Sequence, residues 1–536
     1  MGASPGRRIA AGDTRLPEER RHWAYALAAA LVIAGFCLEA AVYGSTGRMH
    51  YVMRGMRGGP MMTVMYVGMV AMAVGLALAC WSLFPSPRVI LRRRTPDLRV
   101  RARDSQRLTP AHWLVVTGMA LAIAIDFMKP ITVGFVLPGF KSEYGLTSAQ
   151  AASLAFFGIG GTAVGSVFWG WMADRVGRRA TLLFTSLVFI VTSSCGAMIQ
   201  WRANVAMCAV MGLASGGLLP VALAFLAEVL PSRHRGWMMV IIGGELALAY
   251  AASSWLATWL TPEYGWRMLW LAGAPLGLFL VVLSYAVPES PRFLLTVGLR
   301  ERADAVLRRY GMTASESGAA LGGAVPEALP QSSSFASLLR PPLTGRTTAL
   351  WLMGLSAGLV NYGFILWLPV NLSAQGVSVH SADRLLAHSS LVSLPAIILV
   401  ALLYSAWSSK LTVALACAVT CAALALIALI GPTGGVALQG LIVMTLCGNA
   451  ALYATLGPYA GEMYPTYLRS AGTGFAQGWG RVGGVIGPGL VVASITPPGL
   501  AAAAAIGIVP TMLAGLGISG LTGETRRRRL EELGVA

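Results

Sequence analysis

Apolar segments of about 20 residues recur along the chain, and this feature constrains the fold more than any other. A helix needs roughly 20 predominantly apolar residues to cross a bilayer, and segments of this kind alternate here with polar turns. Of the 536 residues, 56% are hydrophobic and only 12% are charged, whereas soluble domains carry about 25% charged residues. The sequence therefore excludes a water-soluble protein and predicts an all-α polytopic membrane protein.

The predicted spans are arranged as two, then six, then a polar gap, then six. The fourteen spans are 23–43, 61–84, 111–138, 147–172, 180–199, 205–229, 237–260, 268–287, 346–371, 386–406, 411–430, 435–459, 470–493 and 500–520. In the gap, apolar residues spaced at helical intervals over 299–310 predict a short amphipathic helix, and the small and polar residues of 313–335 predict a flexible linker. The predicted units are two extra N-terminal helices (1–107), a six-helix half (108–287), a linker (288–345), a second six-helix half (346–522) and a basic tail (523–536).

The net charge of +18 lies in arginine runs between the apolar segments, which indicates membrane topology and no nucleic-acid partner. Arginines before the first span, in 85–110 and in the tail predict that both termini are cytoplasmic in a cell (inner) membrane. Arg48, Arg54 and Arg57 oppose this orientation, because their loop would face outward. The first apolar segment is too long for a signal peptide and is expected to stay as a helix.

A repeat relates the two halves. Each predicted fourth span ends in the pattern E-x-x-P-x-x-x-R, with acid and base at Glu228 and Arg235 in the first half and at Glu462 and Arg469 in the second. Two parallel six-helix repeats explain this pattern, and transporters built from repeats bind their substrates between them near the membrane midplane.

Two motifs carry a family resemblance. The turn after the second core span contains G-x-x-x-D-R-x-G-R-R, formed by Gly170, Asp174, Arg175, Gly177, Arg178 and Arg179. The sixth core span is followed by P-E-S-P-R-F-L, which includes Glu289 and Arg292. Over about 110–522 the chain resembles the major facilitator superfamily, and within it the sugar-porter, organic-ion, aromatic-acid and synaptic-vesicle-protein branches.

This resemblance implies alternating access, in which two halves rock about a central site. It also implies a cytoplasmic gate of ion pairs formed by the motif and repeat residues named above. The alternative is that these residues only fix topology and loop conformation. The second half has neither an acid nor G-R-R at the corresponding turn, 404–410, so a symmetric network is not expected.

Four charges fall deep within predicted spans, where each is costly enough to require a partner or a role. Asp126 is the first choice for a proton carrier, because burial of a carboxylate favours its protonated form. Lys129 lies three residues on and can instead neutralise it as a structural pair. Glu245 is a second candidate for the proton, or a helix-to-helix hydrogen bond.

Arg481 lies at the centre of the eleventh core span and resembles an arginine that organic-ion carriers use for anionic substrates. A guanidinium can hold a carboxylate through two parallel hydrogen bonds, although a buried pair with Glu245 or Asp126 is the alternative. Further residues predicted to line the substrate cavity are Asn361, Tyr362, Trp367, Asn449 and Tyr453.

The chain has no P-loop, no zinc motif and no paired-cysteine pattern, so neither a cofactor, a metal nor an enzymatic activity is expected. The predicted function is proton symport of a small organic anion or related metabolite, with a small molecule, protons and the bilayer as partners. A monomer is compatible with the pattern. A sugar porter, a drug/proton antiporter and a membrane sensor on a transporter scaffold are the alternatives.

Overall fold

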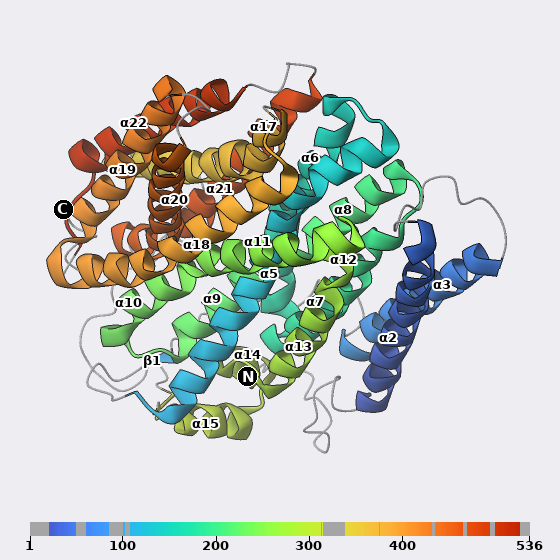
Figure 1. The fold of residues 1–536 in the computed structure, drawn as a ribbon. Coiled ribbons are helices and arrows are strands. Elements are labelled where there is room, and N and C mark those ends of the chain that lie inside the picture. The colour runs from blue at the N-terminus through green and yellow to red at the C-terminus, as the bar shows by residue number, and fades with distance from the viewer. Residues whose placement is uncertain are drawn as a thin grey trace.

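A computed structural model describes residues 21–49, 60–84, 100–101, 108–311, 313–314, 338–374, 376–430, 435–464, 469–493 and 499–525. Most of the predicted flexible stretch 313–335, and the tail from 526 onward, lie outside these residues. Helices dominate the described chain, and the helices of the two halves form neighbouring groups (Figure 1). The predicted all-α membrane architecture is confirmed.

The N-terminal half contains six spans, three of which are divided by short turns. Its helices are α5 (Pro110–Tyr144), α6 (Ser148–Val176), α7 (Arg178–Val191) continued by η2 (Thr192–Ala197), α8 (Trp201–Ser215), α9 (Leu218–Val229), α10 (Ser232–Gly243), α11 (Glu245–Tyr264), α12 (Met268–Leu271) and α13 (Gly273–Ala286). Glycines mark the breaks between α8 and α9 and between α10 and α11, where a missing side chain permits close helix contact.

The C-terminal half also contains six spans. Its elements are α16 (Thr344–Gly358), η4 (Leu359–Phe364), η5 (Ile365–Trp367), α17 (Leu368–Ala374), α18 (Val379–Leu402), η6 (Leu403–Trp407), α19 (Ser409–Ile430), α20 (Gly435–Met463), α21 (Arg469–Val492) and α22 (Leu500–Leu521). The seventh core span thus passes from α-helix through a π-helical turn, η4, before it resumes. Isolated π-helical turns are rare and are frequent at functional sites.

The glycine-rich sequence around Arg481 has a packing reason. A Cβ at Gly358 of α16 would collide with the backbone oxygen of Gly480 on α21. On the next turn, a Cβ at Gly484 would lie 2.7 Å from the Tyr362 ring. Small residues therefore let α21 approach α16 and η4 closely, as in other membrane helix pairs, and this approach positions Arg481 beside η4.

The two extra helices, α2 (His22–Ser45) and α3 (Pro60–Leu83), form a hairpin against the N-terminal half. Figure 1 shows the hairpin at the edge of the molecule, away from α19 and α22. The Tyr25 hydroxyl donates to the Leu183 carbonyl oxygen at 3.3 Å, and the Tyr43 hydroxyl donates to the Tyr264 carbonyl oxygen. These contacts fasten the hairpin to the core at two levels.

The predicted amphipathic helix is present as α15 (Arg300–Arg309), preceded by α14 (Pro291–Val297). Ala303 and Leu307 are buried, and the Tyr310 ring packs at 5.2 Å from the His112 ring of α5. Burial raises the pKa of Tyr310 to about 12. A two-residue antiparallel pairing joins β1 (Val100–Arg101) to β2 (Thr313–Ala314) in the same part of the fold.

Within the described residues, 13 helices are long and apolar enough to cross a membrane. They account for every predicted span except 470–493. That span is present as the helix α21, but Arg481 and its many glycines make it less apolar than the others.

Candidate functional site

Polar side chains from both halves meet in the interior of the bundle. Asn361 and Tyr362 lie on the π-helical turn η4, and the Tyr250 hydroxyl of α11 donates to the Asn361 carbonyl oxygen at 3.4 Å. The Asn449 amide of α20 donates to Asn361 Oδ1 at 3.1 Å. Of these four residues, the N-terminal half supplies Tyr250 and the C-terminal half supplies Asn361, Tyr362 and Asn449, so the cluster joins the two repeats.

Several atoms of this cluster have unused hydrogen-bonding capacity. Among the described residues, Asn361 Nδ2, Asn449 Oδ1 and the Tyr453 hydroxyl have no hydrogen-bond partner of good geometry, and all three atoms are buried. The Asn361 side chain lies close enough to the Tyr362 hydroxyl to influence its ionisation. A buried polar atom without a partner is costly, which makes a ligand that completes these bonds energetically favourable. The three atoms offer both donors and an acceptor.

One cation and one carboxyl complete the cluster. Arg481 of α21 is the charge that acts most strongly on Asp126 of α5, and it also acts on Tyr362 and Tyr453. Within the described chain, however, no ion pair joins Arg481 to Asp126. Arg481 is half-buried, and no described residue hydrogen-bonds to its guanidinium group, whereas Asp126 is 4% exposed.

Lys129 does not form the predicted alternative pair with Asp126. Its ammonium donates to Ser193 Oγ at 2.8 Å and lies 4.5 Å from the centre of the Phe189 ring. Lys129 therefore faces α7 and η2, and Asp126 has no ion-pair partner within the described chain. Glu245 lies at the start of α11 and is half-buried.

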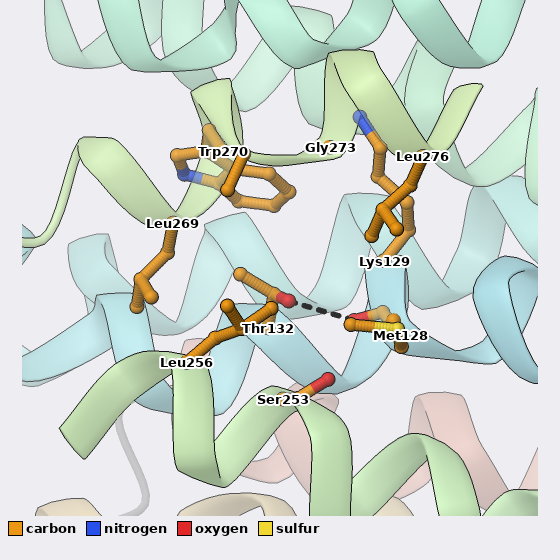
Figure 2. Close-up of a pocket in the computed structure, with 10 residues that line it drawn as sticks. Met128, Lys129, Thr132, Ser253, Leu256, Leu269, Trp270, Gly273 and Leu276 are labelled. Carbon is orange, nitrogen blue, oxygen red and sulfur yellow. Dashed lines mark hydrogen bonds between the residues drawn. The ribbon is translucent and has the colours of Figure 1, made fainter. Parts of the chain in front are cut away.

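A small cavity lies beside Lys129. Figure 2 shows Lys129 extending toward Gly273, while Ser253 and Leu256 line the opposite side. Its volume is about 20 Å³, which is room for one water molecule. Drug-sized ligands occupy cavities of about 300–1,000 Å³, so this cavity is not a substrate chamber in the present conformation.

Trp367 lies apart from the polar cluster. It lines a second cavity of about 20 Å³ together with Asn371, Gly487 and Ala503. Its indole Nε1 is buried and has no partner among the described residues. The structure thus brings five of the six predicted substrate residues toward the centre and leaves Trp367 at a neighbouring position.

The motif after the sixth core span forms two helix caps. Glu289 is 6% exposed, and its Oε1 accepts from the backbone N–H groups of Arg178 (2.8 Å) and Arg179 (3.4 Å) at the start of α7. Ser290 Oγ accepts from the Phe293 N–H at 3.2 Å and caps α14. A carboxylate at a helix N-terminus neutralises unpaired N–H groups and the helix dipole.

Other predicted gate residues have varied settings. The Arg175 guanidinium carbon lies 4.1 Å from the centre of the Trp171 ring. A Cβ added at Gly170 would meet no described atom within 4 Å. Glu462 Oε2 accepts from the hydroxyls of Tyr404 (2.7 Å) and Thr525 (2.6 Å). The side chains outside the described part are those of Asp174, Glu228, Arg235, Arg292 and Arg469.

The C-terminal half contains an acid that the motif search did not single out. Glu524, just after α22, accepts from the Ser409 N–H at 3.1 Å and from the hydroxyls of Ser408 and Ser409. It therefore caps α19 as Glu289 caps α7. The turn 404–410 itself contains no acid, as the sequence indicates, so Glu524 is the counterpart of Glu289 and not of Asp174.

A second unforeseen contact fastens the opposite end of the N-terminal half. Arg267, which is 1% exposed, forms an ion pair with Glu143 at 2.8 Å. It also donates to the carbonyl oxygens of Gly196 (3.0 Å) and Met198 (2.8 Å) and to the Tyr144 hydroxyl (2.6 Å). The two partners lie more than 120 residues apart, and no local pattern signals such a pair.

Comparison with known proteins agrees with this architecture. The chain is 26% identical over 381 residues to the niacin transporter NiaP of Acinetobacter baylyi, covering 70% of this chain and 86% of that protein. It is 26% identical over 387 residues to the gallate transporter of Pseudomonas putida, with coverages of 72% and 86%.

A solved structure shares the fold. The proton:xylose symporter XylE of E. coli superimposes with a TM-score of 0.60 at 16% identity, covering 79% of this chain and 98% of that chain. The family model described as Major Facilitator Superfamily matches residues 115–488. Because that match includes more than half of the chain, the protein belongs to the major facilitator superfamily and is a multi-pass membrane protein of a transporter family.

Proposed function

We propose that the protein is a proton-coupled carrier of a small aromatic carboxylate, working by alternating access. The observation that carries this proposal is the central cluster, where the half-buried Arg481 lies beside η4 and three buried polar atoms lack partners. Niacin and gallate, which the two relatives are named for, are both aromatic carboxylic acids.

The chemistry of the cluster suits such a ligand. The Arg481 guanidinium can donate two parallel hydrogen bonds to a carboxylate, and Asn361 Nδ2 can add a third donor. Asn449 Oδ1 can accept from a ring substituent that carries a proton. The phenol rings of Tyr250, Tyr362 and Tyr453 offer apolar faces for an aromatic ring.

Asp126 is the proposed proton-binding group. It is buried, it has no ion-pair partner in the described chain, and Arg481 is the charge that acts on it most strongly. A bound carboxylate would neutralise the positive charge of the Arg481 guanidinium. Asp126 would then lose the charge that favours its ionised form, so protonation of Asp126 would become more favourable. Substrate and proton would then bind together, which is the requirement for symport.

Alternating access is proposed from the interface between the halves. In the described part of α11 and α18, buried polar atoms without a partner include Ser253 Oγ, Trp255 Nε1, Asp383 Oδ1 and Ser389 Oγ. Each such atom destabilises the state in which it is buried without a hydrogen bond to water or protein. A second state in which this interface opens to water would satisfy them, and the two states could then interconvert at a small free-energy difference.

Uptake by purified protein in proteoliposomes tests the proposal. An inward proton gradient should drive accumulation of radiolabelled niacin or gallate, while xylose and a cationic drug should not accumulate. Arg481→Ala should weaken carboxylate binding at least about 30-fold, because removing one partner of a desolvated charge contact is that costly. The exposed Arg202→Ala is the matched control and should behave as wild type.

The variant Asp126→Asn distinguishes proton binding from carboxylate binding. It should abolish proton-driven accumulation while leaving carboxylate exchange across the membrane at equal pH. Accumulation of xylose or drug alone would overturn the substrate class, and normal proton-driven uptake by Asp126→Asn would remove this residue from the coupling.

A further inference from the structure

Two arginines lie where the N-terminal hairpin meets the core, and both make the same pair of contacts. Arg21 precedes α2, and its guanidinium carbon lies 4.0 Å from the centre of the Trp81 ring, while its Nη1 donates to the Trp81 carbonyl oxygen at 2.7 Å. The guanidinium carbon of Arg179 on α7 lies 5.2 Å from the centre of the Tyr285 ring, and its Nη2 donates to the Tyr285 carbonyl oxygen at 3.2 Å. Each arginine therefore covers the last turn of a helix, α3 or α13.

Two contacts place these arginines at the same level of the bundle. The Tyr25 hydroxyl donates to the Leu183 carbonyl oxygen at 3.3 Å, and the Tyr25 ring centre lies 6.2 Å from that of Tyr285. Tyr25 is in the first turn of α2, and the rest of this helix reaches η2, so α2 and α7 run parallel. Arg21 lies one turn before Tyr25, and Arg179 lies one turn before Leu183. Both arginines are thus at the same end of one seam.

This end of the seam has an excess of positive charge. In the described hairpin, Glu39 is the one acid, and it is buried about five turns along α2 from Arg21. The helix α13 contains no charged residue. Glu289, which follows α13, uses its Oε1 to accept from N–H groups of α7. No acid in the described chain forms an ion pair with Arg21, so an external anion can bind there.

The hydrogen-bonding capacity of Arg21 indicates which anion. A guanidinium group has five N–H donors in a planar fork, and the bond to the Trp81 carbonyl oxygen uses one of them. This fork matches the oxygens of carboxylates and phosphates, and arginine is the preferred side chain for phosphate recognition. A phosphate group between the two arginines would be bound from both sides of the seam.

The surroundings of the seam indicate a lipid. The Trp81 and Tyr285 side chains are 49% and 50% exposed at the ends of two membrane spans, where aromatic residues lie at the level of lipid headgroups. On the same face of α13, Val282 and Leu278 lie three and seven residues before Tyr285 and are 59% and 44% exposed. An apolar strip thus leads from the basic end of the seam into the membrane, as an acyl chain leads from its headgroup.

We propose that this seam, formed by Arg21, Tyr25, Trp81, Arg179 and Tyr285, binds the phosphodiester of an anionic phospholipid, with an acyl chain along α13. The arginine distribution predicts that this end faces the cytoplasm, and basic sites between membrane helices on that side bind anionic headgroups. The lipid fastens the hairpin to the N-terminal half. This role of α2 and α3 goes beyond the proposed transport and does not depend on which solute is carried.

Lipid titration of the delipidated full-length protein in neutral detergent tests the chemistry of the site. Binding is followed by native mass spectrometry and by thermal unfolding. Phosphatidylglycerol should bind at least about fivefold more tightly than phosphatidylcholine with the same acyl chains, because each arginine near the headgroup adds about this factor. Equal affinities would overturn the proposal. Inorganic phosphate at the same concentrations should not stabilise the protein, and protection equal to that of phosphatidylglycerol would contradict a lipid site.

Substitution of the arginines tests the place. Arg21→Gln should weaken phosphatidylglycerol binding about fivefold and leave phosphatidylcholine binding unchanged. Arg179→Gln should do the same, but Arg21 is decisive because it lies outside the family match, residues 115–488. Arg202→Gln is the matched control, since the Arg202 guanidinium carbon lies 5.5 Å from the centre of the Trp201 ring at the opposite end of the bundle. Unchanged affinity in Arg21→Gln, or an equal loss in Arg202→Gln, would refute the site.

A photoactivatable phosphatidylglycerol locates the site without any substitution, so the proposal stays testable if Arg21→Gln fails to fold. Cross-linked wild-type peptides should include residues 21–27 or 278–286, and cross-links confined to the C-terminal half would overturn the assignment. None of these readouts uses transport. If the wild type carries no carboxylate, the proposed function falls and the lipid site is still decided by binding.

Discussion

The two halves of the core end their sixth spans in the same contact, made with different residues. In the N-terminal half, Glu289 follows α13 and accepts from the first backbone N–H groups of α7. In the C-terminal half, Glu524 follows α22 and accepts from the first N–H group of α19 and from the hydroxyls of Ser408 and Ser409. In both halves the sixth span therefore holds the start of the third.

The difference lies in the turn that receives the acid. Gly177 has φ of +116°, and a Cβ there would collide with Glu289 Oε2. Ser408 has an extended backbone with φ of −158° and donates its hydroxyl to Glu524. A helix N-terminus requires only a nearby acceptor or negative charge, so the contact can persist when the sequence motif does not.

Glu289→Ala should cause the largest loss in the free energy of unfolding. It removes the charged acceptor of buried N–H groups of α7, which costs about 3 kcal/mol. This loss is measured by unfolding in mixed detergent and dodecyl sulfate micelles, followed by tryptophan fluorescence. A loss no greater than that of Glu524→Ala would show that burial does not distinguish the two caps.

Gly177→Ala should cost about 2 kcal/mol, because an alanine is strained at this positive φ and its methyl displaces Glu289. Gly170→Ala on the preceding helix is the matched control, since a Cβ there meets nothing. The control should be neutral or slightly stabilising. Equal losses in the same unfolding measurement would contradict a special role for the Gly177 backbone.

Glu524→Ala should cost about 1.5 kcal/mol, less than Glu289→Ala, because Glu524 is half-buried and water can replace part of its bonding. Melting of the two single variants and of the combined variant gives the comparison. The two caps lie in different halves, so their losses should add. Strong non-additivity would mean that the two helix ends communicate.

Ser408→Ala should give the smallest effect, about 1 kcal/mol, because it removes one N-cap. Ser408 Oγ accepts from the Leu411 N–H at 3.0 Å in addition to its bond to Glu524. Ser408→Gly should lose less than Ser408→Ala, as glycine caps are tolerated. The reverse order in thermal melting would show that backbone freedom, and not the cap, dominates this turn.

Much of the fold could be predicted because membrane spans depend on local composition. A run of apolar residues is long enough to cross a bilayer regardless of what surrounds it. The same holds for the helix α15, whose apolar residues repeat at helical spacing. The motif containing Glu289 could also be recognised, since its residues are consecutive.

Only part of the candidate site could be predicted from the sequence. Arg481 and Asp126 stand out because charges are rare within spans, and Asn361 and Tyr362 followed from a family resemblance. Tyr250 gave no signal, because a single tyrosine in an apolar helix is ordinary. Its contact with η4 exists only once two halves of the chain, 111 residues apart, are packed together.

The sequence by itself therefore determined which segments lie in the membrane, that the core is a repeat and which turns carry charge. The tertiary structure alone decided that Lys129 faces η2 and not Asp126, that Glu524 repeats the role of Glu289, and that Glu39 is buried against the core. The physical reason is range. Hydrophobic transfer acts on each segment separately, whereas the partner of a buried charge is set by packing between helices that the order of residues does not specify.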